Sequence, residues 1–388
     1  MDEPNQGRDD GDIDHELDEA LARFTSGEPA PHDPLTPDEP RALDAPPRRP
    51  SLLPWLVIVT VAGVGGLIVG QAELALLAVL GGLFAVAHAA DIDPTRDFAY
   101  RALAWIVPTG SSFLFLSLAM IIWKSELARG PRIVGVVAAA VGALVSIATA
   151  SRAVAHEVAR TLFGQVESSR VSRLAGRLAV LATLLCLPAG LAFPLATEQL
   201  ASQGAPLVGG AAALWGNLVG LILLAMGGVG LWVRRGLVDT LERLGLVPIR
   251  WTDAIVIILG VIAMVGVNGG AEWIQRRWFL QLWIHDQNVN EMIAGGLSRP
   301  ETLLLGLSAG FGEELALRGA LQPRLGVFRT SVLFALLHVQ YSWFGMALIA
   351  ILGLLLGTIR QRSSTSVAIA VHALYDVAAV LAVTASRT

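Results

Sequence analysis

The stretch GFGEELALRGAL, residues 310–321, places three charged side chains inside a long apolar run. Glu313, Glu314 and Arg318 would each cost roughly 2.5–3.5 kcal/mol at the centre of a membrane helix. The surrounding run, 302–322, is nevertheless long enough to cross a bilayer. Charged side chains at that depth are typical of functional sites, because lipid does not tolerate them. We therefore expect this segment to lie in a membrane and to carry a site.

The composition of the whole chain agrees with a membrane protein. Of its 388 residues, 54% are hydrophobic and 15% are charged, whereas soluble domains carry about 25% charged residues. Apolar runs near 20 residues recur along the chain, and the alternating ten-residue segments of a β-barrel do not. The sequence therefore predicts an all-α, multi-pass integral membrane protein, a helical bundle with about 8–11 membrane helices.

The apolar runs also give approximate positions for the spans. The run 331–359 is too long for one simple span and holds QYSWFG (340–345) near its middle, so we expect it to be split or re-entrant. The tryptophan-rich stretch 272–286 resembles an interfacial helix lying before the span at 302–322. The other predicted spans are 52–70, 73–90, 102–123, 133–151, 178–196, 207–233, 254–271 and 365–385.

Composition divides the chain into three regions. Residues 1–50 hold 14 acidic and five basic residues and many prolines. Such a tail cannot bury enough apolar surface to fold alone, so we expect it to be disordered and cytosolic. Residues 51–250 carry transmembrane helices of unassigned role, and residues 251–388 carry the charged motifs. The net charge of −4 gives no reason to expect a nucleic-acid partner.

Arginine placement predicts the orientation in the membrane. Arg48 and Arg49 precede the first span, and the segments 152–177 and 234–250 are arginine-rich. The positive-inside rule assigns these positions to the cytosolic side. Lys124 is the only lysine, and such a preference for arginine is typical of GC-rich bacterial genomes. We therefore expect a multi-pass protein of a bacterial cell (inner) membrane with its N-terminus in the cytosol.

Three groups of ionisable residues lie in the C-terminal third. In the first group, Glu314 and Arg318 are four residues apart, so they share a helix face and can pair. Glu313 points about 100° away and is free to face something else. The second group is FALLH (334–338), and the third is HALYD (372–376). Three such groups so close together favour a site over isolated structural residues.

The second and third groups bring aromatic rings and imidazoles into the same segment. Phe334 and His338 lie one helical turn apart, and His372 and Asp376 share a face. A carboxylate and two imidazoles in a dry bundle can activate a water as a general base or bind a divalent metal. They can also relay protons or form structural ion pairs. The residues alone leave these alternatives open.

A serine motif lies beside the first group. GLSAG (306–310) reads as G-x-S-x-G, a pattern shared with serine hydrolases. Ser308 with His338 or His372 would then form a Ser–His dyad, as in rhomboid proteases. The same pattern is also common where small residues pack membrane helices together. Packing is the interpretation that we favour.

The order E-E-x-x-x-R, then F-x-x-x-H, then H-x-x-x-(N/D) resembles the CPBP (CAAX protease and bacteriocin-processing) family of intramembrane endopeptidases. The Rce1-type prenyl-protein endopeptidases belong to this family. The resemblance covers roughly residues 300–385. It implies an enzyme that hydrolyses a peptide bond of a membrane-associated protein or peptide while embedded in the lipid bilayer.

The resemblance also implies a role for each motif residue. Glu313 would be the catalytic glutamate, and His338 would help it to activate a water. His372 and Asp376 would stabilise the oxyanion, but prenyl-protein endopeptidases have Asn at the last position, and an ionised Asp cannot donate a hydrogen bond. Asp376 therefore orients His372, is protonated, or joins a metal site. The supporting residues would be Glu314, Arg318 and Phe334.

The family leaves the cofactor and some functions open. It is described both as metalloproteases and as glutamate proteases without metal, so Zn²⁺ is a candidate cofactor with Glu313, His338 and His372 as its ligands. One alternative function is a non-catalytic membrane binding or assembly factor with the same fold. Another is a proton-coupled transporter, although the sequence shows none of the inverted repeats that are common in transporters.

Overall fold

A computed structural model of the chain describes residues 51–164, 169–202, 210–294 and 297–385. All named elements in these ranges are helices, and eight of the helices described there are long and apolar enough to cross a membrane. The predicted all-α, multi-pass membrane fold is therefore confirmed. The predicted disordered tail, 1–50, lies outside the described residues.

The helices follow the predicted spans closely. The first half of the chain forms α2 (Leu53–Ile58), η1 (Val59–Val64), α3 (Gly65–Ile68), α4 (Ala72–Ile92), η2 (Pro94–Arg96), α5 (Asp97–Ala104), α6 (Ile106–Lys124), α7 (Arg129–Ala148), α8 (Arg152–Phe163) and α9 (Arg170–Ser202). The second half forms α10 (Gly210–Val229), α11 (Leu237–Arg243), α12 (Asp253–Trp278), α13 (Leu280–Ala294), α14 (Arg299–Leu307), η3 (Ser308–Glu313), η4 (Leu315–Leu321), α15 (Gln322–Leu325), α16 (Val327–Leu336), α17 (Trp343–Arg362) and α18 (Thr365–Ala385).

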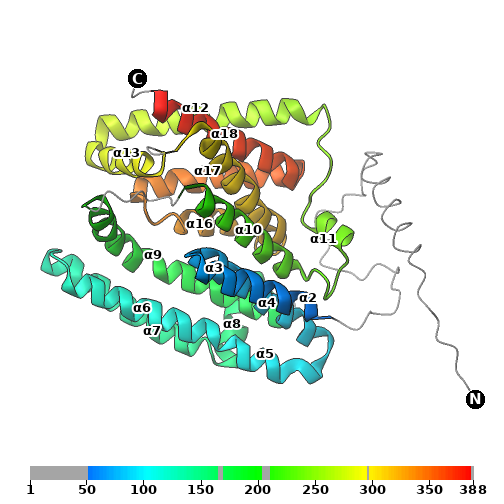
Figure 1. The fold of residues 1–388 in the computed structure, drawn as a ribbon. Coiled ribbons are helices and arrows are strands. Elements are labelled where there is room, and N and C mark those ends of the chain that lie inside the picture. Colours follow the sequence, from blue (N-terminus) through cyan, green and yellow to red (C-terminus); the bar gives the residue numbers. More distant parts are fainter. Residues whose placement is uncertain (1–50, 165–168, 203–209, 295–296, 386–388) are drawn as a thin grey trace, which may run out of the picture.

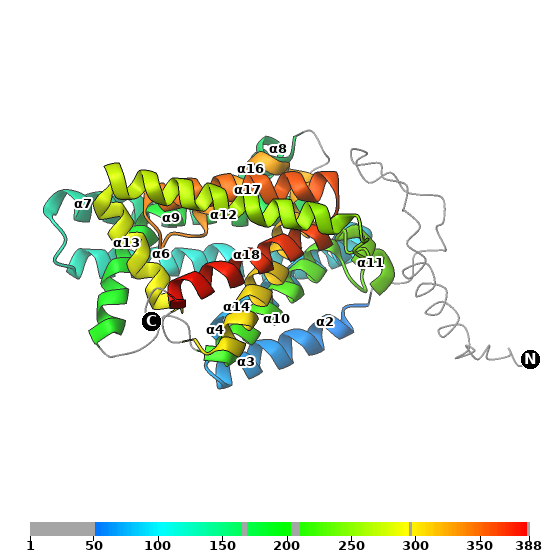
Figure 2. The same cartoon turned by 90° about the horizontal axis from the view of Figure 1, so that it is seen from above.

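The bundle is a succession of packed helices. α6 and α7 pack together on one flank and contact α9, and α9 contacts α4 (Figure 1). α10 lies between α4 and the segment that carries the first motif. α12 runs alongside α17 and α18 on the opposite flank (Figures 1 and 2). The approach of α10 to α4 depends on a glycine, because a Cβ added at Gly81 would lie 2.7 Å from the carbonyl oxygen of Leu223.

The predicted split of the run 331–359 is confirmed. α16 ends at Leu336 and α17 begins at Trp343. The two helices are antiparallel neighbours: an added Cβ on Gly357 would lie 2.8 Å from Val327, and one on Gly353 would lie 3.1 Å from Phe334. α16 has 10 residues and α17 has 20, so α16 alone is short. The chain therefore runs in one direction along α16 and back in the opposite direction along α17.

The predicted interfacial helix at 272–286 is wrong in one respect, because the stretch is not a single helix. α12 ends at Trp278 and α13 begins at Leu280, and Figure 2 shows α13 turning sharply away from α12. Phe279 lies at the break. Its ring packs 5.7 Å from that of Trp343 and 5.6 Å from that of Phe344, at the start of α17. This aromatic contact fixes the turn against the site-bearing half of the bundle.

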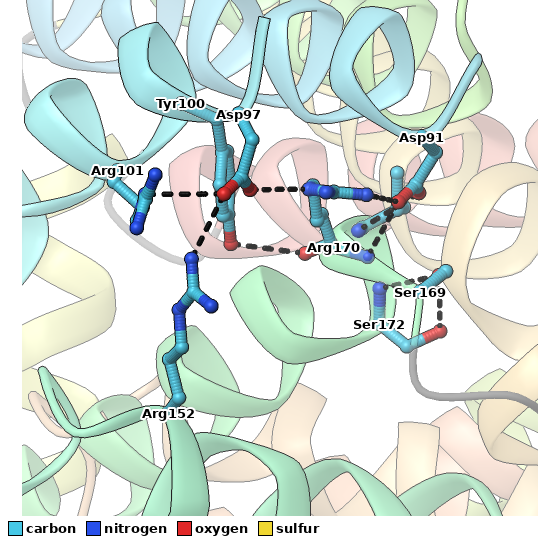
Figure 3. Close-up of polar contacts among 9 residues, drawn as sticks. Asp91, Asp97, Tyr100, Arg101, Arg152, Ser169, Arg170 and Ser172 are labelled. Atoms are coloured by element: carbon cyan, nitrogen blue, oxygen red, sulfur yellow. Dashed lines mark hydrogen bonds and ion pairs between the residues drawn. The ribbon is translucent and has the colours of Figure 1, made fainter. Parts of the chain in front are cut away.

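A network of charged side chains joins α4, α5, α8 and α9 (Figure 3). Arg170 forms ion pairs with Asp91 (3.2 Å) and Asp97 (2.9 Å). Asp91 also accepts the backbone N–H of Arg170 at 2.9 Å, so it caps the first turn of α9. Arg101 and Arg152 contact Asp97 at 3.1 and 2.8 Å. The network ties together the ends of α4, α5, α8 and α9, whose paired residues lie up to 79 positions apart in the sequence.

Candidate active site

The first motif lies on a continuous helical segment built from α14, η3, η4 and α15, which we call the motif helix. It begins with a capping box, in which Ser298 and Glu301 each bond the other's backbone. Its central pieces η3 and η4 are π-helical and flank Glu314 on both sides. π-helical turns inside longer helices occur frequently at functional sites. The local backbone is therefore unusual at the residues that the sequence singled out.

Glycines let the motif helix lie very close to its neighbours. A Cβ added at Gly310 would lie 2.6 Å from the backbone nitrogen of Ala373 on α18. One added at Gly312 would lie 2.8 Å from Leu221 on α10. At Gly310 the close atom is backbone, so a larger residue would force α18 away from the motif helix, whereas at Gly312 the side chain of Leu221 would have to shift. The motif helix is therefore held between α18, which carries the third motif, and α10.

Glu314 is the centre of a buried cluster of charges. Its Oε2 lies 3.4 Å from Nε of Arg318, and its Oε1 lies 3.1 Å from Nδ1 of His372. The N–H of Arg318 is not aimed at Oε2, so this contact is an ion pair without a directed hydrogen bond. Arg318 also donates to the carbonyl of Gly353 at 3.3 Å and lies 4.7 Å over the ring of Phe334. The predicted pairing of Glu314 with Arg318 is confirmed, and His372 joins it.

The third motif supplies a second carboxylate to the same imidazole. Nε2 of His372 lies 3.5 Å from Oδ2 of Asp376, one turn further along α18. His372 is thus placed between two carboxylates, Glu314 on the motif helix and Asp376 on its own helix. Of the three roles that the sequence left open for Asp376, this contact favours the one in which it orients His372.

Glu313 differs sharply from its neighbour. Glu314 is fully buried and engaged, whereas the side chain of Glu313 is only half-buried. Within the described part of the chain, no hydrogen bond or ion pair engages its carboxylate. It lies within electrostatic range of His372, Asp376 and Tyr341. The prediction that Glu313 stays free, beside the other motif residues, agrees with this geometry.

His338 follows the last turn of α16. Its Nδ1 lies 2.8 Å from the carbonyl oxygen of Phe334. A carbonyl oxygen only accepts, so Nδ1 carries the hydrogen, and in the neutral ring Nε2 keeps its lone pair. The ring of Phe334 lies 4.7 Å from that of His338 and 6.0 Å from that of His372. Phe334 therefore connects the two histidines, and it also carries the guanidinium of Arg318 on its face.

Ser308 has a packing role in the structure. Its hydroxyl donates to the carbonyl of Leu214 at 3.0 Å and accepts from the amide of Asn217 at 3.4 Å, both on α10. The flanking Gly306 and Gly310 face α18. The G-x-S-x-G pattern thus supplies small residues to two helix contacts, as we favoured. The hydroxyl is directed away from the histidines, which argues against a Ser–His dyad.

The candidate metal ligands were Glu313, His338 and His372. In the ranges that the structure describes, no three His, Cys, Asp or Glu side chains are gathered closely enough to hold a metal ion. Nδ1 of His372 faces Glu314, and Nδ1 of His338 faces a carbonyl. The residues as they stand do not fit a zinc site, and we derive no chemistry through one. Metal dependence stays a prediction for experiment.

Comparison with known proteins bears on the same region. Residues 295–378 match the family described as type II CAAX prenyl endopeptidase Rce1-like. This part of the chain is similar to the Rce1-like family, and we call it the Rce1-like region. The uncharacterized protein YpbD of Bacillus subtilis (strain 168) is 27% identical over 141 residues, which cover 35% of this chain and 70% of that protein. No solved structure matches the chain. The resemblance carried by the three motifs is therefore confirmed, and the matched residues contain all of them.

Sequence reasoning missed residues on α13 that contact the loop after His338. His285 Nε2 donates to the carbonyl of Gln340 at 3.0 Å, and Tyr341 donates to Asn290 Oδ1 at 2.8 Å. Asp286 accepts from the backbone and hydroxyl of Ser342, each at 2.7 Å. The polar run HDQNVN (285–290) was the available signal. These residues lie before the Rce1-like region.

Proposed function

We propose that this protein is an intramembrane endopeptidase of the CAAX-protease type. Its substrate is a membrane-associated protein or peptide, and it acts in a bacterial cell membrane with its N-terminus in the cytosol. The observation that carries the proposal is the contrast between two adjacent carboxylates. Glu314 is held on both oxygens in a dry cluster, whereas the adjacent Glu313 is half-buried and its carboxylate is unengaged.

A free carboxylate at membrane depth is suited to general-base catalysis. Glu313 takes a proton from a water molecule while the water oxygen attacks the carbonyl carbon of the peptide bond. When the carbon–nitrogen bond then breaks, the proton passes from Glu313 to the leaving nitrogen. The products are a carboxylic acid and an amine, so no co-reactant other than water is required. In this scheme Nε2 of His338, which keeps its lone pair, accepts a hydrogen bond from the attacking water.

The remaining motif residues hold the site in place. Both ring nitrogens of His372 face carboxylates, Nδ1 toward Glu314 and Nε2 toward Asp376, so we assign His372 and Asp376 a supporting role as one wall of the site beside the developing oxyanion. Glu314 and Arg318 fix the position of His372 relative to the motif helix. This accounts for three charges in one apolar run: one does the chemistry, and two support it.

The test uses the full-length protein in liposomes with a library of membrane-anchored peptides. Glu313→Gln keeps the shape of the side chain but removes the base, so cleavage should be abolished while the protein purifies and melts like the parent. His338→Ala should reduce cleavage strongly. Ser308→Ala should leave cleavage nearly unchanged. The matched control for loss of a carboxylate is Glu157→Gln, on the exposed face of α8.

Three outcomes would overturn the proposal. Full cleavage by the double variant Glu313→Gln, His338→Ala would show that these residues are not the water-activating pair. A parent that binds a membrane-protein partner but cleaves none of the peptides would favour the non-catalytic assembly factor. Loss of cleavage in Ser308→Ala with activity retained in Glu313→Gln would instead indicate a serine mechanism.

A further inference from the structure

The loop between α16 and α17, residues 337–342, carries His338 and has little regular structure of its own. Within it, His338 donates its backbone N–H to Ala335 at 3.0 Å, and Tyr341 donates to His338 at 3.1 Å. Such a turn does not by itself fix where the loop lies relative to the motif helix. A catalytic side chain must be held to within a fraction of an ångström, so the loop needs external support.

α13 supplies that support at three consecutive loop residues. Side chains from this helix contact the carbonyl of Gln340, the hydroxyl of Tyr341, and both the backbone and the hydroxyl of Ser342. Ser342 in turn caps α17, because its hydroxyl accepts the N–H of Gly345 at 3.1 Å. One helix thus sets both the end of the loop and the start of α17.

Asp286 is the centre of this contact, and its burial requires an explanation. Its side chain is 6% exposed, and Nε2 of Gln275 on α12 donates to it at 2.6 Å, in addition to the two donors of Ser342. A buried carboxylate is costly unless hydrogen bonds replace its lost water. All three of these donors are uncharged. A carboxylate accepts these donors at both of its oxygens, whereas an amide would turn its own NH2 group toward one set of them.

The surrounding backbone is also fitted to this carboxylate. A Cβ added at Gly345 would lie 2.8 Å from Oδ2 of Asp286, so α17 approaches Asp286 at a position where only glycine fits. Tyr341, held by Asn290, lies within electrostatic range of Glu313 and Asp376. The ring of Tyr341 also lies 6.4 Å from that of His338, so the loop that α13 holds carries both rings.

We infer that Asp286 is a positioning residue that sets the place of His338 by clamping Ser342, with His285 and Asn290 completing the clamp. The inference rests on the proposed function, since it assigns His338 to water activation. It adds α13, which lies outside the Rce1-like residues, to the helices that position the residues of the site. Asp286 itself touches neither the water nor the substrate.

The test compares the full-length parent with Asp286→Asn, Ser342→Ala and the double variant. Asp286→Asn should lower kcat about tenfold or more while leaving KM within about twofold, because a misplaced His338 impairs chemistry rather than substrate binding. Since both single changes break the same clamp, the double variant should be no worse than about the poorer single one. Glu272→Gln is the matched control: Glu272 accepts from Trp283 at 3.4 Å and so also links α12 to α13, but it does not contact the loop.

A second measurement does not depend on catalysis. The backbone N–H of Ser342 donates directly to Asp286, so hydrogen–deuterium exchange of residues 337–342 should quicken in Asp286→Asn and stay slow in Glu272→Gln. Quickened exchange with an unchanged kcat would overturn the inference and leave the proposed function standing. An inactive parent would overturn the proposed function, and exchange would then decide whether Asp286 holds the loop. Unchanged exchange in Asp286→Asn would overturn the clamp in either case.

Discussion

Replacing Arg318 by Met tests whether the buried charges act as one electrostatic unit. Glu314 and Arg318 are both 0% exposed, so losing the cation leaves a carboxylate in a dry environment. Removing one partner of such a pair costs about 3–5 kcal/mol, whereas an exposed pair is worth about 0–1 kcal/mol. His372 remains 3.1 Å from Glu314, which favours the lower end of that range. Methionine keeps much of the side-chain volume and can still pack on Phe334.

A loss of about 3 kcal/mol corresponds to roughly a hundredfold change in the folded-to-unfolded ratio. Reversible unfolding in mixed detergent and SDS micelles would measure it. The double variant Glu314→Leu, Arg318→Met removes both charges and should recover to within about 1 kcal/mol of the parent, because well-packed apolar residues can replace a buried ion pair at little cost. Cleavage should stay low in the double variant, since His372 loses its contact with Glu314. A single variant as stable as the parent, or a double variant no more stable than the single one, would refute the reasoning.

Three other changes give further checks. Gly310→Val should sharply reduce the yield of folded protein because its Cβ would meet Ala373 at 2.6 Å, whereas Gly266→Ala on α12, with nothing within 4 Å, should be neutral in the same expression assay. Arg170→Ala should lower stability by about 1–2 kcal/mol, less at high salt, because the pairs with Asp91 and Asp97 are partly screened; an effect independent of salt would contradict that account. Cleavage should persist in the presence of a chelator, and loss of activity that zinc restores would show that a metal ion gathers ligands that stand apart here.

The sequence predicted the parts of this protein that depend on composition and helical spacing. Apolar run lengths located the spans, and the pair Glu314–Arg318 followed from a four-residue separation. The turn within 331–359 followed from its excessive length. These features are local, so periodicity is enough to find them.

The contacts that complete the site are not local. The approach of His372 to Glu314 joins residues 58 positions apart, and Glu314 is flanked by the π-helical pieces η3 and η4, a geometry that no residue pattern specifies. The clamp on Ser342 joins residues 56 positions apart. The break at Phe279 was missed because the ring contacts that fix it come from α17. Tertiary packing, rather than propensity, decided each of these.

The close packing of α10 against the motif helix means that the Rce1-like region cannot be moved into another protein by itself. Leu221 fills the space opposite Gly312, and Leu214 accepts the hydrogen bond of Ser308, yet α10 lies entirely before residue 295, where the similarity begins. Moving only residues 295–378 into another membrane protein would transfer every motif residue but would omit α10, which packs against them. Lipid tails would then face the glycine side of the motif helix and offer no acceptor to Ser308. A successful graft would have to bring α10 along, as the smallest portable form of the site.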